Sequence, residues 1–324
     1  MEHLSFTLNA VLPLILPILL GYIIRRAGLI GEAFLEQANK LVFTVFIPLL
    51  IFNNLYLADI SQVNWYLALF AFVGTVVSFF IGWLVCLPFA EKKQRGVIHQ
   101  SAVNTNYSVI GLSLSVMLAG SGAAPQASIM AAVIVPSANL LSVISLSVHD
   151  REGAHGALKM TIKKIVTNPL IIAVFAGLIF ILIRWCCQSA GAPITLTEDN
   201  FIVKTLGNLA GVAMPLSLVV LGAGFKFSSA GHMWKQITLA VAMRLVVYTA
   251  IALGVAYAVG MTSPAEFAII ISLFATPVAV SSAPMAVQMK QDGELAGQLV
   301  VWSTLFSAFS LFAIIFLCSA MGLF

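Results

Sequence analysis

Uncharged apolar stretches of about 20 residues follow one another along almost the whole chain, and they leave little of it for a soluble domain. A helix rises roughly 1.5 Å per residue, so each stretch can cross about 30 Å of hydrocarbon. Only 9% of the 324 residues are charged, whereas soluble domains have about 25%. The sequence therefore predicts an all-α polytopic membrane protein in contact with the lipid bilayer.

Ten of these stretches are expected to be transmembrane helices. Residues 96–149 contain no Asp, Glu, Lys or Arg and are too long for one span. The turn-forming run Gly120-Ser-Gly-Ala-Ala-Pro-Gln126 divides them into two. The ten expected spans are residues 6–24, 38–57, 64–88, 97–118, 126–148, 168–188, 205–225, 236–260, 267–289 and 295–321.

The positions of the 16 lysines and arginines predict the orientation of the chain. If the amino terminus lies outside, thirteen of them fall in or beside the inner loops. Arg184 and Lys204 fall in outer loops, and Arg244 falls within a span. Because inner loops are enriched in positive charge, both termini are expected to be periplasmic or extracellular. The net charge of +4 is explained by this bias and does not indicate a nucleic-acid partner.

The two halves of the chain share landmarks at an offset of about 166–169 residues. Pro48 aligns with Pro215, and Trp65 aligns with Trp234. A repeat of five spans is odd-numbered, so the second copy would enter the membrane in the opposite orientation, as in many secondary transporters. Chance alignment of hydrophobic segments is the alternative. The expected organisation is a first repeat at 1–150, a cytoplasmic linker at 151–167 and an inverted repeat at 168–324.

Expected spans 4 and 9 carry polar, helix-breaking segments at about the same depth, roughly 15 Å from opposite faces. These segments are Asn104-Thr-Asn-Tyr-Ser-Val-Ile-Gly111 and Ala275-Thr-Pro-Val-Ala-Val-Ser-Ser-Ala-Pro284. Thr276 followed by Pro277 has the pattern of a helix start, and Asn106 could cap a second half-helix. Two broken helices crossing at the midplane would present two positive helix ends to an anion. A proline kink and a polar helix contact are the alternative.

Arg244 lies roughly 13 Å from the inner face, where an unpaired cation is costly. One interpretation is functional: Arg244 is a counter-ion for a carboxylate substrate, or it locks its helix to the scaffold. The alternative is an arginine whose side chain snorkels along its own helix toward the inner face. The candidate substrate-binding residues are Asn104, Asn106, Tyr107, Ser108, Asn139, Arg244, Thr276, Pro277, Ser281 and Ser282. The candidate hinge residues at the crossover are Gly111, Pro136, Pro277 and Pro284.

Several chemistries are not expected. No Asp or Glu falls in the middle of a span, which argues against cation coupling through buried acids and against an intramembrane aspartic protease. The four cysteines lack metal or redox spacing, so neither a metal nor a cofactor is expected, and the protein is not expected to be an enzyme. The five histidines lie near loops or span ends and are interpreted as solvated, with His99 as a candidate for proton coupling.

Three segments resemble those of a known family. They run from Ala38 to Pro48 in span 2, from Asn106 to Ser113 in span 4, and from Thr276 to Ser307 across spans 9 and 10. Together they resemble the auxin efflux carrier family of secondary transporters, which includes plant carriers and bacterial organic-acid carriers. The resemblance covers nearly the whole chain and is most specific in spans 9 and 10.

The resemblance implies a scaffold of spans 1, 2, 6 and 7, which forms a homodimer, and a moving unit of spans 3–5 and 8–10. It implies transport of small carboxylates, auxin-like or dicarboxylate, by an elevator-type motion. Only about 19 residues join spans 5 and 6, which favours a member from the bacterial inner membrane. A sodium-coupled symporter resembling the bile-acid carriers and a non-transporting membrane sensor are the alternatives.

Overall fold

The computed structural model describes residues 2–57, 64–120, 124–149, 162–163, 165–190, 200–261 and 263–321. Within these ranges the secondary structure is helical apart from one isolated β-bridge. Seven helices in the described part of the chain are long and apolar enough to cross a membrane, which confirms a polytopic helical membrane protein. They are Glu32–Leu57, Trp65–Phe89, Gln126–Val148, Pro169–Ser189, Phe201–Gly224, Trp234–Ala258 and Gly293–Ala320.

The other three expected spans are not among these seven helices. Expected span 1 is helix α1, Glu2–Arg26. Expected span 4 is divided into α5 (Arg95–Val103), the π-helical turn η3 (Tyr107–Gly111) and α6 (Leu112–Ala119). Expected span 9 is divided into α15 (Pro264–Phe274) and α16 (Ser282–Gln288). The two interruptions confirm the predicted breaks, whereas the count of ten membrane crossings stays a prediction.

The remaining helices are continuous or nearly so. Two of them contain a π-helical turn: η1 lies between α2 and α3, and η5 lies between α13 and α14. Their bounds are α2 Glu32–Leu41, η1 Val42–Phe46, α3 Ile47–Leu57, α4 Trp65–Phe89, α7 Ala124–Val148, α9 Pro169–Ser189, α10 Phe201–Gly211, α11 Ala213–Gly224, α12 Phe227–His232, α13 Trp234–Ala242, η5 Met243–Val247, α14 Tyr248–Ala258 and α17 Gly293–Ala320.

Side-chain caps explain where several of these helices begin. Asn168 accepts a hydrogen bond from the Leu170 amide over 2.9 Å at the start of α9, and Pro169 occupies the first helical position. Asp292 accepts from the Leu295 amide over 2.9 Å at the start of α17. Both residues satisfy backbone N–H groups that lack a partner within the helix. The capping residues therefore fix the helix ends that the apolar pattern alone leaves undefined.

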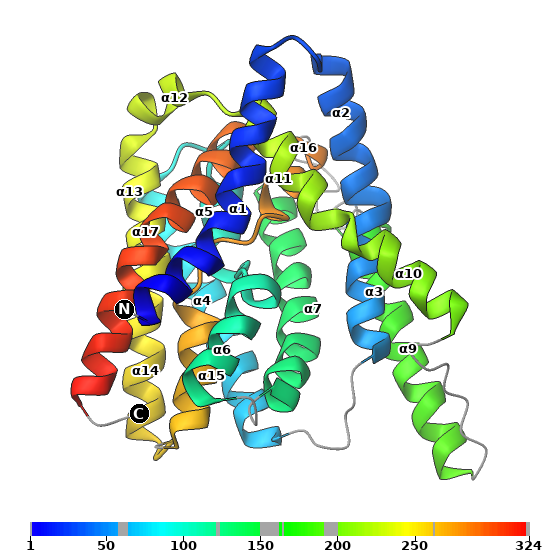
Figure 1. Ribbon diagram of the computed structural model, residues 1–324, viewed down its shortest axis with the longest axis vertical. Helices are drawn as coiled ribbons and strands as arrows, with labels where there is room; N and C mark the ends of the chain where they lie inside the picture. Colours follow the sequence, from blue (N-terminus) through cyan, green and yellow to red (C-terminus); the bar gives the residue numbers. More distant parts are fainter. Residues whose placement is uncertain are drawn as a thin grey trace.

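The helices form two groups that lie side by side (Figure 1). We call α1, α2–α3, α9 and α10–α11 the scaffold group, because α1 packs along α11 while α3 packs against α9 and α10. The core group consists of α4–α7 and α13–α17, in which α5 contacts α4 and α7, α6 contacts α15, and α16 contacts α17. The broken helices lie inside the core group and meet the scaffold group along one face.

Two glycines allow α1 and α11 to cross closely. A Cβ atom added at Gly222 would lie 1.9 Å from the carbonyl oxygen of Ile18. One added at Gly21 would lie 2.0 Å from the carbonyl oxygen of Val219. Small residues at such crossings are typical of helices that pack within a membrane.

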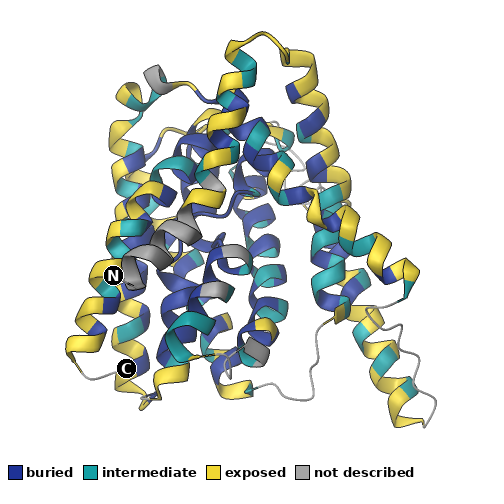
Figure 2. Cartoon of the chain, viewed as in Figure 1, coloured by how far each residue is buried: buried dark blue, intermediate teal, exposed yellow. Residues whose placement is uncertain are grey.

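Exposed residues cover the outside of the molecule and buried ones fill its interior (Figure 2), and many of the exposed side chains are large and apolar while several polar ones are buried. Phe175 on α9 and Phe309 on α17 are exposed, whereas Asn106, Asn139 and Gln298 are buried. This distribution suits a bilayer, because lipid solvates apolar side chains and leaves buried polar groups to find partners inside the protein.

Candidate functional site

The interruptions of the two broken helices lie against each other as a short antiparallel pair. The amide of Asn106 donates to the carbonyl of Pro277 over 2.9 Å, and the amide of Ala279 donates to the carbonyl of Asn104 over 2.8 Å. Unwound backbone deep in a membrane must satisfy its polar groups within the protein. Each break therefore supplies the hydrogen-bond partners of the other, and the crossing is a single structural unit.

The second half of the helix in span 9 does not begin at Pro277, so the capping role predicted for Thr276 is wrong. Helix α16 begins only at Ser282. The Thr276 hydroxyl lies 3.0 Å from the Ser272 carbonyl oxygen and 2.6 Å from the Thr105 hydroxyl oxygen. The chain after Thr276 is held extended by its pairing with the other break, and this pairing overrides the local preference of proline for a helix start.

Arg244 lies in the π-helical turn η5 and is 2% exposed. Its guanidinium donates to the carbonyl oxygens of Thr276 over 3.0 Å, Leu273 over 3.0 Å and Ala102 over 3.3 Å. Leu273 and Ala102 belong to the last turns of α15 and α5, where carbonyls lack helical partners and the helix dipole is negative. Arg244 thus neutralises two helix ends, and the snorkelling interpretation is wrong because the side chain is fully enclosed.

A small cavity of about 40 Å³ lies where the crossing meets the scaffold group. This volume admits a few water molecules at most. Its polar lining comes from Asn104, Thr105, Asn106, Ser108, Asn139, Ser217 and Ser281, and its apolar lining includes Ile47, Ile51, Ala213 and Met214. We call it the crossing cavity. Five of the predicted substrate-binding residues therefore meet in one place.

Two amides in this lining have unused hydrogen-bonding capacity. Among the described residues, neither Asn106 Oδ1 nor Asn106 Nδ2 has a partner, although both are buried. Asn106 also precedes η3 without capping it through its side chain, contrary to the prediction. Asn139 donates through Nδ2 to the Val135 carbonyl over 2.7 Å, and its Oδ1 has no partner in the described part of the chain. A buried amide without a partner is destabilising by about 1–3 kcal/mol, which makes these groups candidates for ligand binding.

The other predicted binding residues lie beside the crossing cavity and do not line it. The Tyr107 hydroxyl donates to the Ala127 carbonyl over 3.0 Å, which ties η3 to α7. The Ser282 hydroxyl accepts from Asn104 Nδ2 over 2.9 Å and so orients an amide that does line the cavity. Pro277 contributes its backbone carbonyl to the crossing. These residues position the cavity wall.

The predicted hinge residues have different local roles. A Cβ added at Gly111 would lie 2.8 Å from the Ser272 carbonyl oxygen, so this glycine permits the close approach of the two broken helices. Pro136 lies within α7, which continues through it. Pro284 is the third residue of α16, where a proline is tolerated because the first turn has no helical N–H bond to lose.

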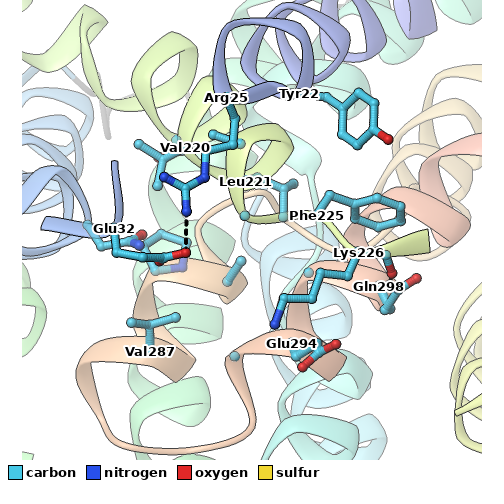
Figure 3. A pocket seen from close by; sticks show the side chains of 18 of the residues that line it. Tyr22, Arg25, Glu32, Val220, Leu221, Phe225, Lys226, Val287, Glu294 and Gln298 are labelled. Atoms are coloured by element: carbon cyan, nitrogen blue, oxygen red, sulfur yellow. Dashed lines mark hydrogen bonds and ion pairs between the residues drawn. The ribbon is translucent and has the colours of Figure 1, made fainter. Parts of the chain in front are cut away.

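A larger open cavity of about 760 Å³ lies next to the crossing cavity, and Ser217 lines both. Figure 3 shows side chains that line the larger one, with Arg25, Glu32, Lys226 and Glu294 among them. We call this larger cavity the vestibule. Its charged lining residues are Arg25, Arg26, Glu32, Lys226 and Glu294. The guanidinium of Arg25 forms an ion pair with Glu32, and the Ser229 hydroxyl donates to Glu294. Three cationic groups against two carboxylates leave the vestibule with a positive balance.

Gln298 forms part of the vestibule wall and was not predicted from the sequence. Its Nε2 donates to the Lys226 carbonyl over 2.8 Å, and its Oε1 accepts from the Trp302 indole over 2.9 Å. Ser217 on the scaffold side was missed as well. A serine or a glutamine in an apolar helix has no distinctive spacing, so only the packing of the two groups identifies these residues.

Comparison with known proteins agrees with the resemblance seen in spans 2, 4, 9 and 10. The profile of a family described as membrane transport protein matches residues 6–155 and 147–315, which together cover nearly the whole chain. An uncharacterized transporter from Methanothermobacter thermautotrophicus is 26% identical over 310 residues, which are 94% of this chain and 95% of the relative. The family consists of transporters and not of enzymes. The chain therefore belongs to the auxin efflux carrier family of membrane transport proteins.

Proposed function

We propose that the protein is a secondary transporter of small organic anions, carboxylates in particular, whose anionic group binds at the crossing cavity. The observation that carries the proposal is Asn106, a lining residue of this cavity, whose two side-chain polar atoms are buried without a partner in the described chain. An amide N–H can donate a charge-assisted hydrogen bond to a carboxylate, which is stronger than a bond between neutral groups.

The electrostatics of the lining favour an anion over a cation. The described residues around the crossing cavity include amides and hydroxyls but no Asp or Glu. The half-helix formed by η3 and α6 begins at Tyr107, beside the cavity, and its first N–H groups carry the positive end of the helix dipole. The cationic balance of the vestibule would raise the local concentration of anions at the entrance.

The transport step in this proposal is a movement of the core group along the scaffold group. The crossing cavity has one wall from each group, with Asn106 on the core side and Ser217 on the scaffold side. Its volume of about 40 Å³ is far below the roughly 300–1,000 Å³ of ordinary ligand pockets, so a carboxylate enters only when the two walls separate. An elevator-type displacement separates them and carries the crossing toward the opposite membrane face.

The topology proposed for this mechanism has ten membrane crossings in two inverted repeats, residues 1–150 and 168–324, joined by the linker 151–167. Both termini lie outside, so the vestibule opens to the cytoplasm. We further propose a homodimer formed through the scaffold group, whose helix α9 exposes apolar side chains, and a location in the bacterial inner membrane.

Sodium coupling is a second candidate, because the oxygens of Asn106 and Asn139 in the lining are unpartnered within the described residues. Oxygen ligands of this kind suit a hard cation. Sodium would then raise both the thermal stability of the purified protein and its affinity for a carboxylate. Binding without transport would instead favour the sensor alternative.

A thermal-shift screen of monocarboxylates and dicarboxylates, with and without sodium, should identify a ligand for the purified protein. Uptake of that ligand into proteoliposomes then tests transport. Asn106→Leu should lose uptake, and Asn208→Leu, at an exposed position on α10, should retain it. Equal uptake by the two variants would contradict a substrate site at the crossing cavity, and binding without any uptake by the wild type would contradict transport.

A further inference from the structure

Three side chains of types that can bind a metal, from α4, α5 and the residue after α7, meet at one end of the core group. Cys86 lies near the end of α4, His99 lies on α5, and His149 follows the last residue of α7. The ligand atoms of all three lie within 4.8 Å of one another. His99 is 1% exposed and His149 is half-buried, so the interpretation of these two histidines as solvated residues is wrong.

The distances within this cluster are close to those of a tetrahedral metal site. His149 Nε2 lies 3.3 Å from His99 Nδ1 and 3.7 Å from Cys86 Sγ. Zinc binds nitrogen at about 2.0–2.1 Å and sulfur at about 2.3 Å, which places neighbouring ligand atoms of a tetrahedron roughly 3.3–3.6 Å apart. The remaining pair, His99 and Cys86, lies within 4.8 Å, so side-chain rotations that close this gap would bring the three atoms onto one ion.

The hydrogen bonding of His99 prepares it to act as a ligand. His99 Nε2 lies 2.9 Å from the carbonyl oxygen of Phe79. A carbonyl can only accept, so Nε2 carries the proton and the lone pair of Nδ1 faces His149. Metal-binding histidines characteristically use their second nitrogen in this way, because the bond fixes both the tautomer and the ring orientation.

We propose that Cys86, His99 and His149 form a binding site for Zn²⁺ that ties α4, α5 and α7 together. Thiolate and imidazole ligands favour a borderline ion such as zinc, whereas Mg²⁺ and Ca²⁺ require oxygen ligands. On binding, the Cys86 thiol gives its proton to water and the thiolate donates an electron pair to the metal. A water molecule would complete four-coordination. The inference is independent of the proposed substrate.

The first test uses full-length protein that has been stripped with a chelator and freed of any histidine tag. Titration with Co²⁺ should give one equivalent of bound metal with a thiolate-to-cobalt charge-transfer band, and Zn²⁺ should displace it. Cys86→Ser should abolish the band, and His99→Gln should lower the affinity by at least the 10–100-fold typical of losing a supporting contact. Cys318→Ser, at a buried cysteine of α17, is the matched control and should leave the band unchanged.

A second measurement needs no variant, so it remains decisive if Cys86→Ser fails to fold. In the wild-type protein, Zn²⁺ should slow alkylation of Cys86 by a maleimide and should leave the rate at Cys318 unchanged, as read by peptide mass spectrometry. The proposal is overturned if the folded wild type gives no charge-transfer band, if the band persists in Cys86→Ser, or if zinc protects neither cysteine or both equally.

Discussion

Asn106 illustrates how a functional residue can weaken the fold that contains it. Its backbone amide is used in the crossing, while both polar atoms of its side chain are buried without partners in the described structure. Such a group is destabilising by about 1–3 kcal/mol in the absence of ligand. If a carboxylate supplies the missing partner, binding recovers this energy. Asn106 then favours the bound state because it is unsatisfied only in the free state.

The first prediction therefore separates stability from binding. Asn106→Leu should leave the melting temperature of the ligand-free protein unchanged or higher, because it removes two unpaired polar atoms. The same change should weaken carboxylate binding about 10–100-fold, since a hydrogen bond to a charged group is worth roughly 1.5–3 kcal/mol. Thermal unfolding and isothermal titration check the two effects. A large loss of stability in ligand-free Asn106→Leu would show that the amide is structural.

Arg244, in contrast to Asn106, is predicted to stabilise the fold. Arg244→Met removes the donor of three buried carbonyls, so the free energy of unfolding should fall by about 3 kcal/mol or more. Arg244→Lys should retain part of this stabilisation. The control is Arg184→Met, because Arg184 on α9 donates over 2.8 Å to the Tyr56 carbonyl and is only partly buried. A stable Arg244→Met variant that has lost only substrate affinity would restore the counter-ion interpretation.

At the scale of elements, the sequence indicated where the two helices break but not how the breaks are stabilised. Polar residues and Pro277 at equal depth in spans 4 and 9 were sufficient to predict the interruptions. The pairing of the two breaks, and the three carbonyls bound by Arg244, join residues more than 25 positions apart. Such contacts depend on tertiary packing, which no local pattern encodes, and the same reason hid the cluster of Cys86, His99 and His149.

The crossing of α1 and α11 gives a prediction at this scale. Gly222→Ala places a methyl group where the carbonyl of Ile18 already lies, so the helices must separate. Overpacking of this kind is destabilising by about 1–3 kcal/mol and should lower the melting temperature. Gly224→Ala is the matched control, because a Cβ there meets nothing within 4 Å. Equal melting temperatures for the two variants would mean that α1 and α11 do not cross this closely.

At the scale of the whole molecule, charge distribution predicts the orientation that the proposed function requires. Lys93, before α5, should lie in the cytoplasm, and Lys204, on α10, should lie near the outer face; both are exposed. In a background without the native cysteines, an impermeant maleimide should label Lys204→Cys in intact cells and Lys93→Cys only after permeabilisation. The reverse pattern would place the vestibule on the outer side.

The elevator-type motion requires the core group to slide along the scaffold group while the helices of the scaffold group keep their contacts with one another. Gly297 on α17 and Leu221 on α11 belong to different groups, and a Cβ at Gly297 would lie 3.0 Å from Leu221 Cδ1. Gly177 on α9 and Leu55 on α3 both belong to the scaffold group, and a Cβ at Gly177 would lie 2.8 Å from the Leu55 Cβ. The Leu221 Cβ lies beyond 4 Å from a Cβ at Gly297, so the bridge between the groups is the longer of the two. The two bridges are expected to have opposite consequences.

The last prediction compares these bridges in proteoliposomes, with each pair of residues replaced by cysteines in a background without the native ones. Bridging positions 221 and 297 with Hg²⁺ should stop carboxylate uptake, and a thiol reductant should restore it, because the bridge fixes the core group against the scaffold group. Bridging positions 55 and 177 should leave uptake unchanged, since no relative motion occurs within the scaffold group. Full uptake with a bridge between 221 and 297 that is verified by mass spectrometry would exclude sliding between the groups as the transport step.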